Sequence, residues 1–339
     1  MKLRKSLITA SIAAAVALGA MGQVQASVYA GAFLEIDNLV ISTTGVGDPA
    51  VPINYLFNTR NTATLNGTNA IETATCQGVI STVSGTDCNT TGNVLDAAPA
   101  QVGTTQADNN FSYLGPGGNE YARADSVIID AQLVNAQPTH TINIAESELQ
   151  ASGSASASSD IQSTTGLTFV FDVSGPGTIS VAFDADIGLL AHIAEPGALI
   201  ASAQASTSVQ WLFSQDNTGN SVTWNPETVG TGACVDGAQS GVGVTCDSQT
   251  VGEDLNQEVS VNTVPNSEDA YSRSPATDPG FTAFSATFSF VEAGRYTLAL
   301  TENKQVQVSL LKVPEPTTLL LLGSGLFGMG IARRRIRKA

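Results

Sequence analysis

Two aspartates, Asp184 and Asp186, form the carboxylate pair of this chain that is best placed to do chemistry. They lie two residues apart in a segment where apolar and polar residues alternate, so both side chains belong to one face of a β-strand. Such a pair could help to bind Ca²⁺ or could serve as the acid and base of a glycoside hydrolase. The simpler alternative, which we adopt as the expectation, is that both are solvated charges protecting the face of a sheet. We therefore expect no metal and no cofactor.

Further catalytic signatures are sparse. The chain has two histidines, His140 and His192, and it contains no GxSxG, HExxH, P-loop or CxxC motif. Residues 323–328 spell GxGxxG, but they lie inside an apolar run without the strand–turn–helix context that a dinucleotide site requires. We therefore expect a protein that is not an enzyme, with a glycoside hydrolase based on Asp184 and Asp186 as a remote alternative.

The two tryptophans bear on another alternative, a glycan-binding module of the cell surface. Exposed aromatic rings are typical of sugar-binding faces. Trp211 belongs to the apolar set of its strand and is expected in the core, whereas Trp224 precedes an Asn-Pro turn and is expected to be half-buried. An exposed Trp224 would favour the glycan-binding alternative.

The tail from Pro314 to Ala339 combines three chemically different pieces in a fixed order. Pro314-Glu315-Pro316 holds the backbone extended, because proline excludes regular helix. An apolar run, residues 317–332, follows, and as a helix it is shorter than the ~20 residues needed for a comfortable membrane span. A basic cluster completes the tail: Arg333, Arg334, Arg335, Arg337 and Lys338.

This tripartite tail resembles the PEP-CTERM sorting signal, which bacteria pair with an exosortase, a membrane-embedded processing enzyme. The resemblance covers the tail. It implies that Pro314, Glu315 and Pro316 are recognised by the exosortase, that the apolar run is a transient membrane anchor, and that the basic residues are a topological stop. It also implies C-terminal anchoring, followed by a cell-surface or extracellular location after processing.

The first 26 residues are typical of a Sec-type signal peptide. A basic segment, residues 2–5, precedes an apolar run, residues 7–21, and Ala26 closes a small-residue cleavage site, so cutting is expected after Ala26. The basic residues at both ends should stay cytoplasmic by the positive-inside rule, which predicts that residues 27–313 are exported across the inner membrane.

The segment expected to be exported is strongly acidic. Residues 27–313 contain 29 of the 30 acidic residues and 6 of the 14 basic ones, a formal charge of −23. An exterior of this charge repels phosphate backbones, which excludes a nucleic-acid-binding protein, and it favours solubility or association with cations. The chain also has 32 glycines and 13 prolines among many Ser, Thr and Asn residues, a composition typical of β-rich exported proteins.

The four cysteines fall into two pairs with equal spacing. Eleven residues separate Cys76 from Cys88, and eleven separate Cys234 from Cys246. Four cysteines allow three connectivities, but the matched local spacing and an oxidising compartment favour the disulfides Cys76–Cys88 and Cys234–Cys246. Each disulfide would raise the free energy of unfolding by about 3 kcal/mol in the chain-entropy model.

Apolar and polar residues alternate along much of the exported segment, and no stretch of it shows helical periodicity. Residues 28–41 alternate except at Asp37-Asn38, which predicts a bend or a β-bulge within a long strand. Residues 151–159 alternate Ala with Ser, and we expect a strand there rather than a flexible linker. Other predicted strands lie within residues 125–134, 167–187, 199–214 and 284–310.

Three-residue turns are expected between consecutive strands. The apolar positions of residues 167–187 are all odd-numbered and those of residues 284–310 all even-numbered, so a two-residue turn would place core residues opposite surface residues. The first hairpin would bring Asp172 to the same polar face as Asp184 and Asp186. The expected turns are Gly175-Pro176-Gly177, Glu292-Ala293-Gly294 and Glu302-Asn303-Lys304.

These observations predict an all-β fold, an antiparallel β-sandwich or jelly-roll ectodomain over residues 27–313. Two polar, disulfide-stapled insertions lie within it, at residues 43–120 and 215–281. A signal peptide, residues 1–26, precedes it, and the sorting signal, residues 314–339, follows. The expected function is that of a structural or adhesive protein of the surface or of an exopolysaccharide biofilm matrix, with an exosortase, exopolysaccharide and, transiently, the membrane as partners.

Overall fold

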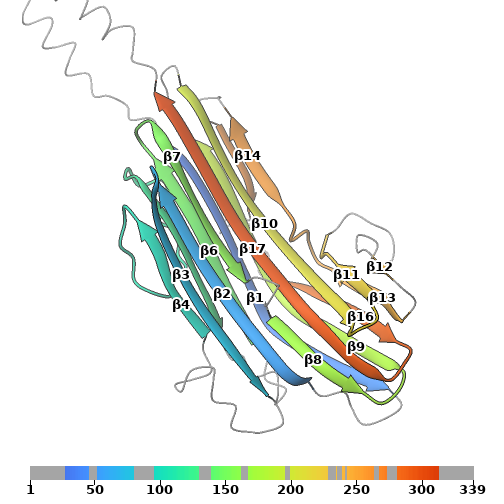
Figure 1. Ribbon diagram of the computed structural model, residues 1–339. Helices are drawn as coiled ribbons and strands as arrows, with labels where there is room; N and C mark the ends of the chain where they lie inside the picture. Colours follow the sequence, from blue (N-terminus) through green and yellow to red (C-terminus); the bar gives the residue numbers. More distant parts are fainter. Residues whose placement is uncertain are drawn as a thin grey trace, which may run out of the picture.

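The computed structural model describes residues 27–45, 52–79, 95–129, 139–161, 167–194, 199–227, 234, 239–240, 243–262, 267–272 and 281–312. These residues form seventeen β-strands, all paired antiparallel, in two sheets that lie face to face (Figure 1). No helix long and apolar enough to cross a membrane is found among them. The signal peptide and the sorting tail predicted above lie outside the described residues.

Sheet A contains eight strands, with β1 near its centre. Its order is β13 (Val244–Val251), β16 (Thr282–Phe290), β9 (Gly177–Ile193), β1 (Val28–Gly45), β6 (Thr139–Leu149), β5 (Tyr121–Ile129) and β4 (Leu95–Val102), and β15 (Ser267–Ser272) also pairs with β9.

Sheet B contains nine strands, with β17 near its centre. Its order is β12 (Gln239–Ser240), β11 (Ser221–Trp224), β10 (Leu199–Gln215), β17 (Gly294–Lys312), β7 (Gly153–Ile161), β2 (Pro52–Leu65) and β3 (Thr68–Val79). β14 (Glu258–Asn262) pairs with β10, and β8 (Leu167–Val173) pairs with β17 and β2.

Four long strands, β1, β9, β10 and β17, give the molecule its elongated shape (Figure 1). Shorter strands share the tracks beside them: β8 and β7 follow one another along β17, and β16 and β15 do so along β9. The core therefore extends along the whole length of these strands.

Aromatic side chains fill one half of the space between the sheets. Trp211 of sheet B is fully buried, and its ring lies 6.1 Å from that of Phe183 in sheet A. The ring centroids of Phe213 in sheet B and Phe288 in sheet A lie 5.5 Å apart. Fully burying one side chain of this kind stabilises the fold by roughly 1.5–3 kcal/mol, so these rings are a main source of cohesion between the sheets.

Two local predictions are confirmed. The register of β1 shifts between Ile36 and Leu39 against β6 and between Asp37 and Val40 against β9, and Asn38 has a positive φ of 54°, as expected of a bulge. The Ala/Ser segment forms β7, with Ala155 and Ala157 buried.

Two of the predicted hairpins are wrong. β8 belongs to sheet B and β9 to sheet A, while β16 belongs to sheet A and β17 to sheet B, so both connections carry the chain from one sheet to the other. The alternation of apolar residues is the same in either case, because a strand turns its apolar side toward the core whichever sheet it joins. Asp172 consequently lies in sheet B, where it faces Arg295 across β8 and β17.

The third predicted turn, Glu302-Asn303-Lys304, is also wrong. β17 passes through these residues without a break, and Glu302 and Lys304 are fully buried among the even-numbered positions that face sheet A. The alternation that places even-numbered residues in the core continues across these three residues. It predicts their strand conformation better than their polarity does.

The two polar stretches are integral to the sheets rather than insertions. Residues 43–120 supply β2, β3 and β4, and residues 215–281 supply β11 to β15. A tight turn joins β2 to β3, with φ of 48° at Asn66 and 84° at Gly67. Positive φ at both central residues is characteristic of a type I′ hairpin, and the Asn-Gly pair was the sequence signal for it.

Gly67 and Gly103 both have positive φ, but they differ in the space around them. Replacing each by alanine therefore distinguishes the cost of backbone strain alone from the cost of strain together with steric overlap. Gly67 (φ 84°) has no atom within 4 Å of an added Cβ, whereas at Gly103 (φ 79°) that carbon would overlap Glu120 O and lie 2.9 Å from Leu65 Cδ2. We expect Gly67→Ala to lower the free energy of unfolding by about 1–2 kcal/mol. Gly103→Ala should lower the free energy of unfolding by roughly 1–3 kcal/mol more than Gly67→Ala does, because its added Cβ also overlaps neighbouring atoms. Urea unfolding of both variants measures this, and equal losses would contradict the packing described for Gly103.

Candidate functional site

The predicted carboxylate pair lies on the outer face of sheet A. Asp184 and Asp186 are both half-buried in β9, and Asp184 Oδ2 accepts a hydrogen bond from Asn38 Nδ2 at 2.9 Å. In the register with β1, Asp184 is opposite Asp37 and Asp186 is opposite Glu35. Asp172, in the other sheet, is not brought to this pair.

The two histidines form pairs with glutamates on the same sheet. His140 Nε2 lies 2.7 Å from Glu35 Oε1, and His192 Nδ1 lies 3.3 Å from Glu268 Oε2. Each pair joins neighbouring strands, β6 with β1 and β9 with β15.

Neither tryptophan is at the surface. Trp224 is opposite Trp211 in the pairing of β11 with β10, and both side chains are fully buried against Phe183. The expectation that Trp224 is half-buried is therefore wrong, and the exposed ring that would favour a glycan-binding face is not present at this position. The short apolar alternation of Val222 and Trp224 was a signal of a buried strand.

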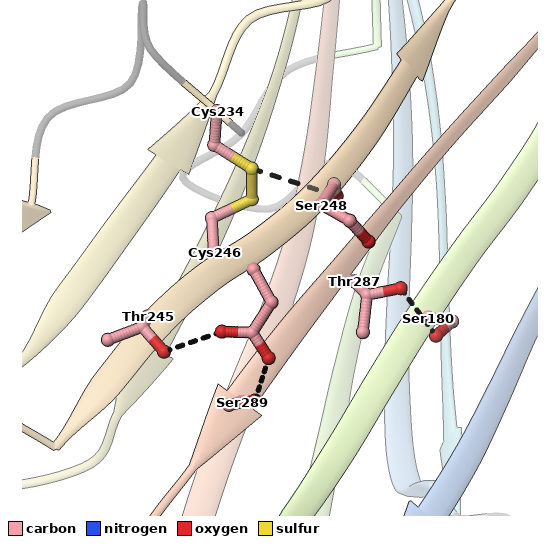
Figure 2. The surroundings of a disulfide bond; sticks show 8 residues. Ser180, Cys234, Thr245, Cys246, Ser248, Thr287 and Ser289 are labelled. Atoms are coloured by element: carbon pink, nitrogen blue, oxygen red, sulfur yellow. Dashed lines mark hydrogen bonds between the residues drawn. A yellow bond between two sulfur atoms is a disulfide. The ribbon is translucent and has the colours of Figure 1, made fainter. Parts of the chain in front are cut away.

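A disulfide joins Cys234 to Cys246 of β13, as their spacing predicted, with the two Cα atoms 5.7 Å apart (Figure 2). It ties Cys234 to β13, the edge strand of sheet A. Further into the sheet, the hydroxyls of Ser180 in β9 and Thr287 in β16 lie 3.0 Å apart. Cys76 of β3 is also disulfide-bonded and buried, and its predicted partner Cys88 lies outside the described residues.

A buried polar cluster that the sequence did not reveal lies beneath residues 103–120, here called the β4–β5 loop. Glu146 of β6 is at its centre: Oε1 accepts from Tyr29 Oη at 2.7 Å and from Leu114 N at 3.0 Å, and Oε2 accepts from Arg123 Nε at 2.6 Å. Both Glu146 and Arg123 are almost completely buried. Burial, together with Glu146, raises the pKa of Tyr29 well above its usual value, so its hydroxyl stays a donor.

The β4–β5 loop is attached to the sheet by these same groups. Arg123 donates from Nη1 to Asn110 O at 2.9 Å and from Nη2 to Ser112 O at 2.6 Å. Further along the loop, Gly117 N donates to Glu148 Oε2 at 3.0 Å, and Tyr113 Oη donates to Gly188 O at 2.8 Å. The outer face of β5 and β6 is therefore covered by the chain's own loop, which explains why both faces of these strands are buried.

Three aspartates gather at one end of the β4–β5 loop. Asp96 of β4, Asp108 of the loop and Asp125 of β5 each place a carboxylate oxygen within 4.8 Å of those of the other two, an arrangement that could hold a metal ion. Burial, followed by Asp108 and Asp96, raises the pKa of Asp125 to about 7. Burial and Asp96 also raise the pKa of Asp108. Because these residues come from three separate elements, no local motif in the sequence announces the cluster.

A second polar cluster crosses the interior of the sandwich. Glu302 of β17 accepts hydrogen bonds from Thr141 Oγ1 at 3.0 Å and from Asn143 Nδ2 at 2.8 Å in the opposite sheet, and from Lys304 Nζ at 2.8 Å. Burial lowers the pKa of Lys304, and Glu302 opposes that shift. Glu302 and Lys304 thus form an ion pair in the core, and the hydrogen bonds of Glu302 link sheet B to β6 of sheet A.

The Arg123–Glu146 pair should be far more important for stability than the exposed Arg295–Asp172 pair, which is also held by two hydrogen bonds, at 2.9 and 3.1 Å. We expect Glu146→Gln to lower the free energy of unfolding by about 3–5 kcal/mol, because it leaves Arg123 as an unpaired buried charge. Asp172→Asn should have a much smaller effect, since water screens the exposed pair. Urea unfolding tests both, and amide exchange should become faster within residues 103–120 for Glu146→Gln alone.

The predicted sorting residues, from Pro314 to Lys338, and the predicted cleavage site at Ala26 lie outside the described residues. Comparison with protein families matches residues 312–338 to the PEP-CTERM protein-sorting motif. No curated protein and no solved structure matches the chain. The strand β17 thus leads directly into the matched segment, and the chain carries the sorting motif of an exported protein that is anchored at its C-terminal end and processed by an exosortase-type enzyme.

Proposed function

We propose that this protein is a non-enzymatic structural or adhesive component of the cell surface or of the exopolysaccharide matrix, released there after its tail is processed. The observation that carries the proposal is the PEP-CTERM match at residues 312–338, which begins at the last residue of β17. Only Val313 separates that strand from Pro314. The folded domain would therefore sit close to the membrane until the exosortase acts.

The use of polar side chains in the described domain supports a structural role. Glu146, Arg123, Glu302 and Lys304 are buried, and each is bonded to groups of the protein itself. Buried side chains that form their hydrogen bonds within the protein hold loops and sheets in place, and they are not available to a substrate.

The charge of the exported segment supports a matrix location. A formal charge of −23 over residues 27–313 keeps copies of the protein apart and attracts cations, which anionic polysaccharides attract as well. Divalent cations shared between the two would be a means of association that requires no carbohydrate-binding pocket. A glycan-binding module remains the alternative, although the burial of Trp224 removes the aromatic residue on which it was based.

Processing of the tail can be tested by the intact mass of the mature protein. In cells that contain an exosortase, we expect a product that starts at Ser27 and ends near Pro316. The double variant Pro314→Ala, Pro316→Ala should retain residues 333–338, because the extended motif is then lost. A wild-type product that keeps Arg333 to Lys338 in those cells would contradict the proposal.

Fractionation of the same cells tests the matrix role. The processed wild-type protein should be recovered with the exopolysaccharide, and the double variant should stay with the membrane. Recovery of the processed protein only in the culture medium would show that it is secreted without a matrix role. Retention of the purified protein on a neutral glycan in excess EDTA would instead favour the glycan-binding alternative.

A further inference from the structure

Three elements converge on one point at the edge of sheet A. Asp96 is in β4, Asp125 is in β5, and Asp108 is in the loop between these strands. The bulge of β4 between Ala97 and Ala100 lies directly after Asp96 and faces Asp125 across the pair. The pairing of β4 with β5 therefore brings Asp96 and Asp125 close together, and the loop adds the exposed Asp108.

Two of the carboxylate oxygens in this cluster are buried and have no partner. Asp125 is fully buried, and its Oδ1 accepts no hydrogen bond; Asp96 Oδ1 is in the same condition. The other oxygen of each is held by Asn109, through Nδ2 to Asp96 Oδ2 at 2.5 Å and through the backbone N to Asp125 Oδ2 at 3.1 Å. Asn109 thus fixes both carboxylates with one free oxygen each.

Leaving buried acceptors unpaired is costly, and more so when the group is charged. A buried unpaired oxygen therefore calls for an explanation, and an unseen ion is one of the standard ones. Gln106 Oε1, in the same loop two residues before Asp108, is a third buried oxygen without a partner.

The charges of the cluster are also unbalanced. Asp96, Asp108 and Asp125 each place a carboxylate oxygen within 4.8 Å of those of the other two, so three acidic groups share one small volume. The basic group that acts on Asp125 is Arg123, but its guanidinium is already bonded to Glu146 and to the loop carbonyls. A bound cation would neutralise the excess negative charge.

We propose that Asp96, Asp108 and Asp125 form a Ca²⁺-binding site. Hard oxygen ligands suit Ca²⁺, which accepts six to eight of them in flexible geometry, whereas Zn²⁺ favours nitrogen and sulfur. Water molecules would complete the shell on the side of the exposed Asp108. Within the part of the chain that the structure describes, this cluster takes the place of Asp184 and Asp186 as the candidate metal site.

The ion would lock the β4–β5 loop onto the sheet. The loop is already attached by Arg123, Glu146 and Glu148, which bond to residues 110–118, and Asp108 of the aspartate cluster lies just before these attachments. Bound Ca²⁺ would join the loop to β4 and β5 at once, so the cover over the outer face of sheet A would be more stable in a calcium-containing exterior. This inference does not depend on the proposed matrix role.

Titration of the purified full chain with Ca²⁺ after treatment with EDTA tests the site. We expect a calorimetric signal of one ion per chain and a higher Tm with Ca²⁺ than with EDTA, because an ion that binds the folded state stabilises it. Asp125→Asn and Asp108→Asn should each weaken binding by at least about tenfold, since affinity follows the number of charged ligands. Asp186→Asn, a carboxylate on the outer face of the same sheet but outside the cluster, is the matched control and should bind as the wild type does.

The stability of the variants in EDTA distinguishes aspartates that bind Ca²⁺ from aspartates that only support the fold. In EDTA, Asp108→Asn removes repulsion and should be at least as stable as the wild type, while losing the increase in Tm with Ca²⁺. A variant that is destabilised equally in EDTA and in Ca²⁺ would indicate a structural aspartate and would overturn the proposal. An absence of any Ca²⁺ effect on the wild type, or an equal loss in Asp186→Asn, would do the same.

Discussion

The alternation of side chains along β17 is the constraint on which the rest of the sandwich depends. Every even-numbered side chain from Tyr296 to Leu310 faces sheet A, and Glu302 and Lys304 occupy two of these positions. Charges in a core are tolerated only when they are paired and hydrogen-bonded, so the facing strand β6 presents Thr141 and Asn143 to Glu302. The middle of the core is therefore polar, with aromatic packing around Trp211 and Phe213 on one side of it and smaller side chains such as Ala203 and Val308 on the other.

The outer face of sheet A follows a similar logic on the other side of the same strands. Glu146 and Arg123 are buried there because the β4–β5 loop covers them, and the loop holds its position because they bond to its backbone. Stability of the cover and burial of the charges are thus mutually dependent, which makes the arrangement cooperative. The aspartate cluster beside that loop contains buried carboxylate oxygens of Asp96 and Asp125 that accept no hydrogen bond, and a cation is the partner that we propose for them.

Much of the fold was predictable because period-two alternation is local. It identified the bulge at Asp37-Asn38, the Ala/Ser strand and the core position of Trp211. It could not assign strands to sheets, because a hairpin and a crossing between sheets place apolar residues at the same parity; the connections β8–β9 and β16–β17 were misread for that reason. Polarity was a poor guide at Glu302 and Lys304, since two opposite charges in a core can satisfy each other.

The sequence by itself determined the all-β class, the Cys234–Cys246 pairing and the sorting tail, because each rests on spacing between residues close together in the chain. Tertiary structure decided which sheet each strand joins and which carboxylates meet. Asp184 and Asp186 are neighbours in sequence and drew the first hypothesis, whereas Asp96, Asp108 and Asp125 come together only when β4 pairs with β5 and the loop folds back between them. The physical reason is that strand pairing and loop packing depend on long-range contacts, whose partners no local pattern specifies.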